Sequence, residues 1–345
     1  MSKFFIKDRQ IGPGSPPLVI AEIGINHEGS MEKAILMVDD AARVGCECVK
    51  FQSHIIDDEM APAAKEVIPG NANESIWDIM SRCTFNEEQE IALKNYVESK
   101  GMIFLSTPFS RASADRLERM GVAAYKIGSG ECNNYPLIEH IAKFGKPIIL
   151  STGMNDLDAI SISVEILRKH KVPFALLHCT SIYPTPYDKI RLGGMTELGQ
   201  RFHTDLFGLS DHSVSNYPCL GAVALGACIL ERHFTSDMTW PGPDVPISMD
   251  PRALDDLITG ANAIFQARGG SKTILKEEAP TIAFAYACVV STTAIKLGEP
   301  LSQSNIWVKR PGTGEIKAKD FESVLGRKAK RDIASGEQIS WGDFE

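Results

Sequence analysis

Short apolar runs alternate with longer amphipathic stretches between residue 17 and about residue 270. The longer stretches, among them 31–45, 86–101 and 156–171, repeat apolar residues at the spacing of a helix. Asn86 is a favoured helix start, and Gly101 is a favoured helix end. The shorter runs predict strands at PLVIAEIG (17–24), CECVKFQ (46–52), MIFLSTP (102–108), AAYKIGS (123–129), KPIILST (146–152), FALLHCTSIYP (174–184), LFGLSDHS (206–213) and CILERHF (228–234).

This alternation of strands and helices predicts a parallel sheet with helices packed against it. Eight repeats are the number found in a (β/α)8 TIM barrel, so the predicted fold class is α/β. A doubly wound open sheet is the competing arrangement. It is disfavoured because no G-x-G-x-x-G sequence follows the first strand.

A polar segment, GGSKTILKEEAP (269–280), follows the last helical pattern. We therefore expect a catalytic barrel at 1–269, a linker at 270–283 and a small β-rich domain at 284–345. Within this small domain IKLGEPLS (295–302) resembles IASGEQIS (333–340). The echo predicts a turn and strand used twice, with internal pseudo-symmetry. The sequence I-x-x-G-E is also common enough in turns to recur by chance.

The composition narrows the class of partner. The net charge is −8, which disfavours nucleic-acid binding because phosphate backbones select clustered Lys and Arg. The N-terminus lacks the apolar core of a secretory signal, and no apolar stretch is long enough to span a membrane. Eight cysteines lie mostly in apolar runs, which is typical of reduced core residues. A cytoplasmic location is expected.

Polar residues gather where the predicted strands end. Residues two apart in a strand point the same way, and barrel enzymes collect their catalytic groups at the carboxyl ends of the strands. Each residue taken alone could simply begin a loop, but the whole set favours a site. The set comprises Glu22, Lys50, Gln52, Thr107, Lys126, Ser129, Ser151, Tyr183, Ser210, His212, Glu231 and His233.

His212 and His233 are the most informative pair for a metal site, because they lie at the ends of the neighbouring seventh and eighth strands. A single histidine is more often a hydrogen-bonded structural residue. Two together, with Glu231 in phase with His233, favour binding of one metal ion. Imidazoles with carboxylates and water suit Mn²⁺, Co²⁺, Fe²⁺ or Zn²⁺, and the sequence does not choose among them.

Lys50 and Lys126 lie in apolar strands, where an unpaired ammonium is costly. The partner is either an internal carboxylate or a bound phosphate. Two lysines with several strand-end hydroxyls favour phosphate. By contrast, His27 and His54 follow the first two strands and are expected to be solvated loop residues, whereas His178 is expected to be packed.

Long strings of this chain resemble the sialic acid synthases. The resemblance covers essentially the whole chain and implies a (β/α)8 barrel followed by a small antifreeze-like (SAF-type) domain. It rests on AEIGINHEGS (21–30), VKFQSH (49–54), STPFS (106–110), YKIGSGECNNYPLI (125–138), ILSTGM (149–154), LLHCTSIYPTPY (176–187), GLSDHS (208–213), ILERHF (229–234), PGPD (241–244) and WVKRPGTG (307–314).

The resemblance also implies a role for each matching residue. His212 and His233 would bind a divalent metal, Mn²⁺ in the typical case, with Mg²⁺ or Co²⁺ as alternatives. Glu22 and Glu231 would be the catalytic residues. The phosphoenolpyruvate site would comprise Lys50, Thr107, Lys126, Ser129, Ser151, Ser181 and Ser210, although the closest bacterial relatives carry Asn in place of Ser181. The sugar site would comprise Gln52, Glu131, Tyr183, Asp244, Phe284 and Arg310.

The activity implied is the metal-dependent condensation of phosphoenolpyruvate with N-acetylmannosamine and water, giving N-acetylneuraminic acid and phosphate. The resemblance further implies a swapped homodimer in which Arg310 and Phe284 reach the partner subunit's barrel. A synthase for legionaminic or another nonulosonic acid, using a diacetamido sugar, is the nearest alternative. A non-catalytic sugar-binding protein is a more distant one, because it would need neither the two histidines nor the two lysines.

Overall fold

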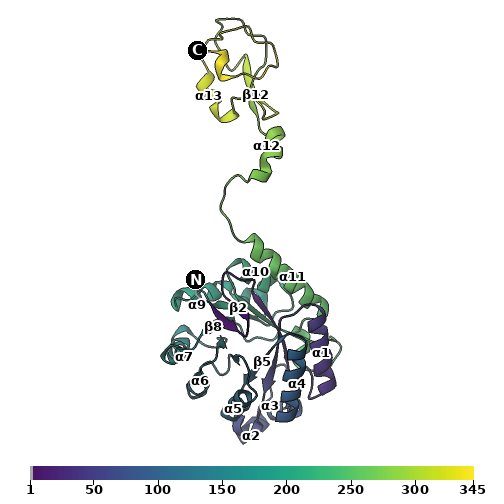
Figure 1. Ribbon diagram of the computed structural model, residues 1–345. Helices are drawn as coiled ribbons and strands as arrows, with labels where there is room; N and C mark the ends of the chain where they lie inside the picture. Colours follow the sequence, from purple (N-terminus) through teal and green to yellow (C-terminus); the bar gives the residue numbers. More distant parts are fainter. Residues whose placement is uncertain (1–2) are drawn as a thin grey trace. The chain divides into compact units, whose positions relative to one another are not determined.

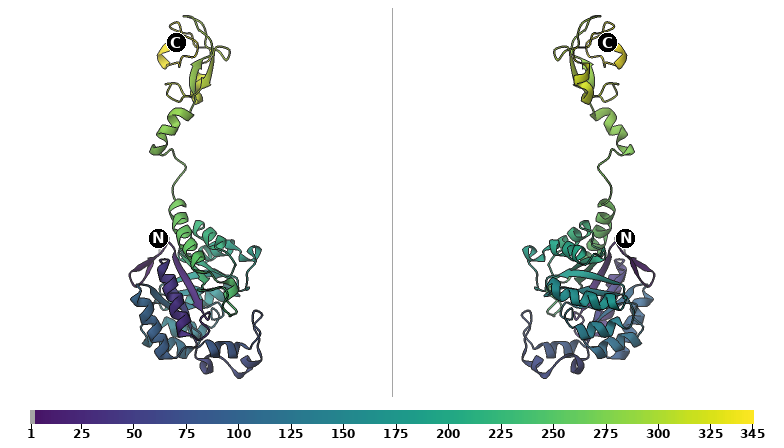
Figure 2. Two further views of the ribbon diagram at one scale, coloured as in Figure 1. Left: turned by 90° about the vertical axis from the view of Figure 1, so that its right-hand side faces the viewer. Right: turned by 90° about the vertical axis from the view of Figure 1, so that its left-hand side faces the viewer.

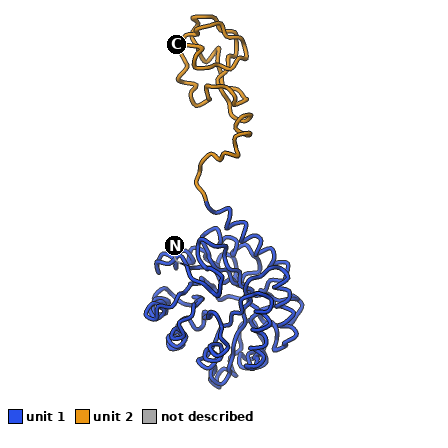
Figure 3. The backbone as a smooth tube through the Cα atoms, viewed as in Figure 1, with its two compact units in different colours: residues 1–269 blue, residues 270–345 orange. Residues whose placement is uncertain are grey.

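The computed structural model describes residues 3–345, which form two compact units, 1–269 and 270–345 (Figure 3). Among the helices of the described residues, none combines the length and the hydropathy needed to cross a lipid bilayer. All eight cysteines are buried and free, as expected for reduced core residues.

Unit 1 is built on one eight-stranded parallel sheet with the order β5-β4-β3-β10-β9-β8-β7-β6. The end strands β5 and β6 lie against each other, which closes the sheet into a barrel. The predicted (β/α)8 fold is therefore confirmed. The strands are β3 (Leu18–Gly24), β4 (Cys48–Ser53), β5 (Ile103–Pro108), β6 (Tyr125–Ile127), β7 (Ile148–Ser151), β8 (Phe174–Cys179), β9 (Phe207–Asp211) and β10 (Ile229–His233).

Helices surround the strands on the outside (Figures 1 and 2). Local signals set their ends: the Asn86 side chain accepts a hydrogen bond from Gln89 N in a capping box, and Gly101 adopts a positive φ just beyond the same helix. The helices of unit 1 are α1 (Met31–Arg43), α2 (Ile56–Glu59), α3 (Ile76–Cys83), α4 (Glu87–Ser99), α5 (Arg111–Arg119), α6 (Tyr135–Ala142), α7 (Leu157–Lys169), α8 (Tyr187–Ile190), α9 (Leu192–Arg201), α10 (Tyr217–Ala224) and α11 (Pro251–Ala267).

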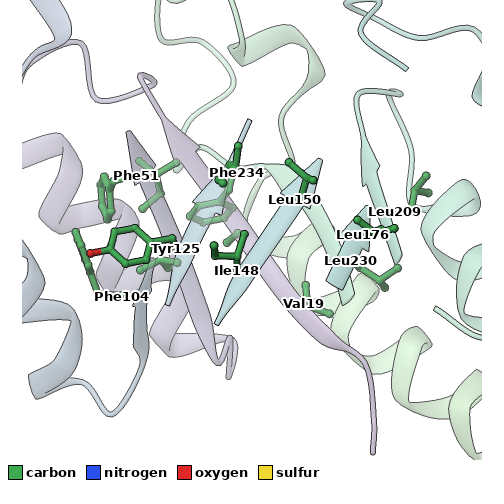
Figure 4. Close-up of a cluster of buried hydrophobic side chains, with 14 of the residues drawn as sticks. Val19, Phe51, Phe104, Tyr125, Ile148, Leu150, Leu176, Leu209, Leu230 and Phe234 are labelled. Carbon is green, nitrogen blue, oxygen red and sulfur yellow. The ribbon is translucent and has the colours of Figure 1, made fainter. Parts of the chain in front are cut away.

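The main hydrophobic core lies between the barrel and its helices. Side chains from alternate strand positions, including Phe51, Phe104 and Tyr125, point outward into this layer (Figure 4). A second, smaller core fills the amino-terminal half of the barrel interior with residues such as Leu18, Ile20 and Leu105. Because strand side chains alternate, the inward positions further along the same strands are free to carry chemistry.

An N-terminal hairpin that the sequence did not predict adds to the inner core. Strand β1 (Phe4–Ile6) pairs with β2 (Arg9–Ile11) in an antiparallel ladder. Phe4, Ile6 and Ile11 are almost completely buried and pack with the residues of the inner core. The amino-terminal end of the barrel is thus sealed by hydrocarbon.

Unit 2 contains a two-stranded antiparallel sheet, β11 (Cys288–Ser291) with β12 (Ile306–Lys309). The segment expected to be a linker contains the helix α12 (Ala279–Ala285), and α13 (Phe321–Val324) lies further on. The predicted internal echo is confirmed as a turn used twice, but residues 295–302 and 333–340 form isolated bridges rather than the predicted strands. Ile295 and Ile333 exchange two backbone hydrogen bonds, at 2.9 and 2.8 Å, and each belongs to a turn closed by a glutamate that accepts from a backbone N–H.

Candidate active site

One large pocket lies at the carboxyl ends of the barrel strands and encloses about 1060 Å³ of empty space, counted to its open mouth. Every site residue that the sequence predicted within unit 1 lines this pocket. These are Glu22, Lys50, Gln52, Thr107, Lys126, Ser129, Glu131, Ser151, Ser181, Tyr183, Ser210, His212, Glu231, His233 and Asp244.

The strand pleat explains this convergence. In β4, Cys48 belongs to the inner core while Val49 and Phe51 belong to the outer one. Lys50, between the two outward residues, therefore points into the barrel above Cys48. The same phase on β10 directs Glu231 and His233 inward, above Ile229.

The two buried lysines are paired with the two buried glutamates. Lys50 Nζ lies 2.8 Å from Glu22 Oε2, and Lys126 Nζ lies 3.3 Å from Glu231 Oε1. Lys50 is also 3.9 Å from Glu231, so the four groups form one cluster. The internal carboxylates considered as alternative partners of the lysines are therefore present, and a phosphate would join or replace them.

Burial and neighbouring charges shift the pKa values of the two glutamates in opposite directions. Burial raises the pKa of Glu22, and the Lys50 ammonium offsets that effect only in part. Burial acts on Glu231 as well, but the ammonium groups of Lys126 and Lys50 outweigh it and lower the pKa of that carboxyl. Neighbouring carboxyls with separated pKa values are suited to acid and base roles.

Several hydroxyls of the set line the same cluster. Lys50 Nζ donates to Thr107 Oγ1 at 3.1 Å, and Ser210 Oγ donates to Glu231 Oε1 at 3.2 Å. Ser129 Oγ accepts from Gly153 N at 3.0 Å. Ser151 Oγ is buried, and none of the residues 3–345 gives it a hydrogen-bond partner. A buried hydroxyl without a partner indicates a site for a ligand or ordered water.

The two histidines lie side by side, with ring centroids 5.5 Å apart. His212 Nδ1 faces the carbonyl oxygen of Thr180 at 3.0 Å, which directs Nε2 away from the backbone, and Tyr183 stacks on its ring at 4.2 Å. His233 Nδ1 is buried without a hydrogen bond in the described chain, and its nearest carboxylate is Asp244 at 3.8 Å. Burial lowers the pKa of His233 well below its usual range, so this imidazole is neutral.

These residues fit a divalent ion in two respects. His212 contacts a backbone carbonyl oxygen through Nδ1, and metal-binding histidines typically have such a contact. The Nδ1 of His233 is buried and has no hydrogen-bond partner in residues 3–345, so it is available for a ligand. Within residues 3–345, however, no group of three or more His, Cys, Asp and Glu side chains gathers as a complete ligand set. Any ion here would complete its coordination with substrate or water.

Two family models match this chain. The model of the NeuB family matches residues 37–273, and that of the SAF domain matches residues 286–345. The first match alone covers more than half of the chain. The chain belongs to the NeuB family. The resemblance to sialic acid synthases noted from the sequence is thereby confirmed.

Relatives of this NeuB-family chain match it over nearly their full lengths. It is 37% identical to the N,N'-diacetyllegionaminic acid synthase of Campylobacter jejuni, over 93% of this chain and 98% of that one. It is 36% identical to an uncharacterized protein of Methanocaldococcus jannaschii, over 100% and 99%. The crystal structure of the N-acetylneuraminic acid synthetase of Leptospira borgpetersenii superposes with a TM-score of 0.75, at 31% identity, over 81% and 95%.

The prediction for His54 in this NeuB-family chain is wrong. His54 was expected to be a solvated loop residue, but it is buried, with its ring stacked on Phe109 at a centroid distance of 4.5 Å. Its Nδ1 lies 2.8 Å from Glu59 Oε2 and its Nε2 lies 3.0 Å from Gln52 Oε1. Gln52 Nε2 in turn donates to Glu22 Oε1 at 3.0 Å. A chain of contacts therefore runs from Glu59 to the catalytic candidate Glu22.

His27 was also expected to be solvated and is also buried, because it stacks on Phe85 at 4.3 Å. His178 is packed as expected, and its Nε2 contacts the carbonyl oxygen of Ile190 at 2.7 Å. The spacing could have indicated that His54 is buried near the site, because it lies two residues beyond Gln52, which points into the barrel. Its partner Glu59 lies in α2, a helix that the sequence pattern does not predict.

Glu131 lies on the far side of the lysine cluster, in the loop after β6. Burial, with the nearby Glu59 carboxylate second, raises the pKa of Glu131 to about 7. Its Oε2 is buried and lacks a hydrogen-bond partner in the part of the chain that is described. Near neutral pH this carboxyl is therefore able to donate as well as accept a hydrogen bond.

The last two predicted sugar residues, Phe284 and Arg310, belong to unit 2 rather than to the residues of this pocket. Phe284 is 63% exposed, and Arg310 is exposed as well.

Proposed function

We propose that this protein condenses phosphoenolpyruvate with an N-acetylated amino sugar to form a nonulosonic acid and inorganic phosphate. The observation that carries the proposal is the meeting of Lys50 and Lys126 with Glu22 and Glu231, beside two imidazoles, in one barrel-mouth pocket. Membership of the NeuB family and the synthase names of its relatives support the same reaction.

Phosphoenolpyruvate would occupy the lysine side of the pocket. Its phosphate and carboxylate would be bound by Lys50 and Lys126, whose Nζ atoms lie 3.9 and 3.3 Å from the same oxygen, Glu231 Oε1. The orphaned hydroxyl of Ser151 supplies a further donor, together with Ser129 and Thr107. Preorganised positive charge in a dry site stabilises a phosphate oxygen far more strongly than it would in water.

Glu22 and Glu231 are the carboxyl groups of this cluster that would move protons in the reaction. Carbon 3 of phosphoenolpyruvate forms a bond to the sugar's aldehyde carbon, and the aldehyde oxygen takes a proton from Glu22. Water adds to carbon 2 and gives a proton to Glu231, whose lowered pKa keeps it ionised as a base. The bond between carbon 2 and the bridging oxygen breaks, the hydroxyl proton at carbon 2 passes to the departing phosphate, and a ketone remains.

His212 and His233 are the residues that would hold a divalent metal, with Mn²⁺ as the expected ion. Bound there, such an ion would supply Lewis-acid polarisation of the sugar's carbonyl oxygen. Tyr183, stacked on His212, keeps that ring in place, and Asp244 lies on the other side next to His233. The two residues would then border the sugar side of the pocket.

N-acetylmannosamine, with N-acetylneuraminic acid as product, is one candidate sugar, and the Leptospira synthetase supports it. A diacetamido sugar is the other. It is favoured by the Campylobacter relative, whose name specifies a diacetylated product.

We also propose that the protein is a homodimer in which the partner's small unit contributes to the sugar site. The exposed ring of Phe284 and the exposed guanidinium of Arg310 support this assignment. Subunit exchange tests it. An equal mixture of Arg310→Ala and His233→Ala enzymes should recover about a quarter of wild-type activity if one active site combines both chains. No recovery after exchange would refute the shared site.

The reaction itself is tested by phosphate release from phosphoenolpyruvate in the presence of Mn²⁺. Release should require an N-acetylated amino sugar, and ¹⁸O at the bridging position should appear in the phosphate. Sugar-independent release, or no release with either candidate sugar, would overturn the proposal. Label retained in the sugar acid would refute cleavage of the carbon–oxygen bond.

A further inference from the structure

One side of the pocket differs in chemistry from the strand-end cluster. The connection between β4 and α4 is long, and it brings α3 to the pocket. Apolar side chains from this connection and from the loops after β3 and β10 line that side. We call this set the apolar wall; it comprises Ile25, Pro69, Ala72, Ile76, Ile79, Met80 and Pro243.

The apolar wall is a built surface rather than a loose loop. Ser75 caps α3 by accepting a hydrogen bond from Asp78 N at 3.1 Å. Ile79 and Cys83, on the inner face of α3, pack against Ile25 in a small cluster separate from the barrel cores. Long connections with their own apolar cluster are often functional.

Polar contacts fix the apolar wall to the rest of the barrel mouth. Arg82 at the end of α3 contacts Glu28 in the loop after β3 at 3.0 Å. Asn71 Nδ2 donates to the carbonyl oxygen of Pro243 at 3.4 Å, which links the connection to the loop after β10. Asp244, a predicted sugar contact, follows Pro243 directly. The apolar wall therefore borders the sugar side of the pocket rather than the lysine side.

The apolar wall should bind the methyl groups of a sugar better than its hydroxyl groups. Apart from Asn71, the connection contributes no hydrogen-bonding side chain to the pocket. A sugar hydroxyl pressed against it would lose water without gaining a hydrogen-bond partner. A methyl group placed there would gain from burial.

We propose that the apolar wall is a specificity subsite for the methyl end of an acylamino group. It makes a diacetamido sugar, in which a second N-acetyl group replaces a hydroxyl, the preferred substrate over N-acetylmannosamine. The inference rests on the proposed function and names its substrate class. The identity with the Campylobacter N,N'-diacetyllegionaminic acid synthase agrees with it.

The test uses the full-length enzyme with Mn²⁺ and phosphoenolpyruvate, and measures kcat/KM for a 2,4-diacetamido sugar and for N-acetylmannosamine. Met80 is half-buried and linear, so Met80→Gln introduces an amide with little change of shape. We expect wild type to favour the diacetamido sugar, and Met80→Gln to lower that preference about tenfold, the low end for a methyl-sized contact.

Two matched variants and one stability measurement complete the design. Met80→Leu keeps the apolar wall apolar, and Ile91→Gln places the same polar group on the exposed face of α4, outside the pocket. Both should leave the preference within about twofold of wild type. Thermal unfolding of each variant reports whether the barrel is intact.

The outcomes separate the inference from the function beneath it. A wild-type preference for N-acetylmannosamine, or an unchanged preference in a folded Met80→Gln enzyme, overturns the specificity subsite and leaves the synthase reaction standing. Absence of phosphate release with both sugars overturns the synthase reaction itself.

Discussion

The two ends of the barrel interior both bury their side chains, but they carry opposite chemistry. At the amino-terminal end Leu18, Ile20 and Leu105 pack with the β1–β2 hairpin, and each is fully buried. At the carboxyl end Lys50 and Lys126, equally buried, meet carboxylates and orphaned polar atoms. Hydrocarbon stabilises a fold, whereas buried charges with incomplete partners cost stability and are retained at functional sites.

The change occurs within single strands. Along the inward column of β4, Cys48 belongs to the apolar core, and Lys50 and Gln52 belong to the pocket. One strand therefore serves stability at its start and chemistry at its end, as is usual in TIM barrels. Mutations at the two ends should separate these two contributions.

The largest expected effect is on catalysis at the carboxyl end. Replacing His233 with Ala removes one of the two imidazoles that converge in the pocket, and we expect the rate of phosphate release to fall on the order of 10³-fold. Because the buried Nδ1 of His233 has no hydrogen bond to lose, the melting temperature should change little.

His178→Gln is a matched control, because His178 is a buried strand histidine that contacts the backbone of Ile190 outside the pocket. That variant should lower the melting temperature and preserve the rate of the folded enzyme. Full activity in His233→Ala would contradict a catalytic role for this end of the barrel.

The next effect should be confined to the amino-terminal end. Ile20 is completely buried in the inner core, one inward position before Glu22 on the same strand. Ile20→Ala should lower the free energy of unfolding by about 2–5 kcal/mol through lost burial and a cavity. The kcat of the remaining folded enzyme should stay within about twofold of wild type, measured by titrating activity against folded fraction. A rate loss larger than the folded-fraction loss would mean that the two ends are coupled.

Much of this arrangement could be predicted from the sequence. The eight strands could be predicted because each is a short apolar run bounded by turn residues. Because strand side chains alternate between two faces, the sequence also predicted that Lys50, Glu231 and His233 point into the barrel. The fold and the gathering of the strand-end residues in unit 1 therefore depend on local patterns that one sequence displays.

What the sequence did not reveal depends on long-range contacts. Strands β1 and β2 are only three residues each and gain their place from packing on the barrel, so propensity gave no signal. The contact of His54 with Glu59 required knowledge of α2, a four-residue helix inside a polar connection. The partners of Lys50 and Lys126 were left open for the same reason, since pairing across strands is a tertiary property.

A smaller effect should appear in the pH dependence of stability. The pKa of Glu131 is raised from an ordinary 4.5 to about 7, so its protonated form is favoured in the folded chain. Its contribution to stability is present in full below about pH 4.5 and is lost as the pH rises through 7. Glu131→Gln should therefore gain about 3 kcal/mol relative to wild type between pH 4.5 and pH 8. Denaturant unfolding at several pH values measures this, and parallel stability curves for the two proteins would contradict it.

The smallest effect tests whether the polar end extends beyond the residues that touch substrate. His54 lies outside the strand, yet its ring nitrogens join Glu59 to Gln52, and Gln52 donates to Glu22. His54→Phe keeps the ring stacked on Phe109 and removes both polar contacts. With the amide of Gln52 no longer held, Glu22 loses a fixed donor, and kcat should fall about tenfold with KM changed less.

The matched control for His54→Phe is His140→Phe, because His140 also pairs with a carboxylate, Asp115 at 2.7 Å, and also contacts an aromatic ring, Phe144. It lies on α6, away from the pocket, so its replacement should leave kcat unchanged. A shift in the pH profile of kcat for His54→Phe alone would identify His54 as a positioning residue for Glu22. Equal behaviour of the two variants would limit the functional end of the barrel to the strand-end residues, and the buried His54 would then belong, with the hairpin and the inner core, to the structural part of the molecule.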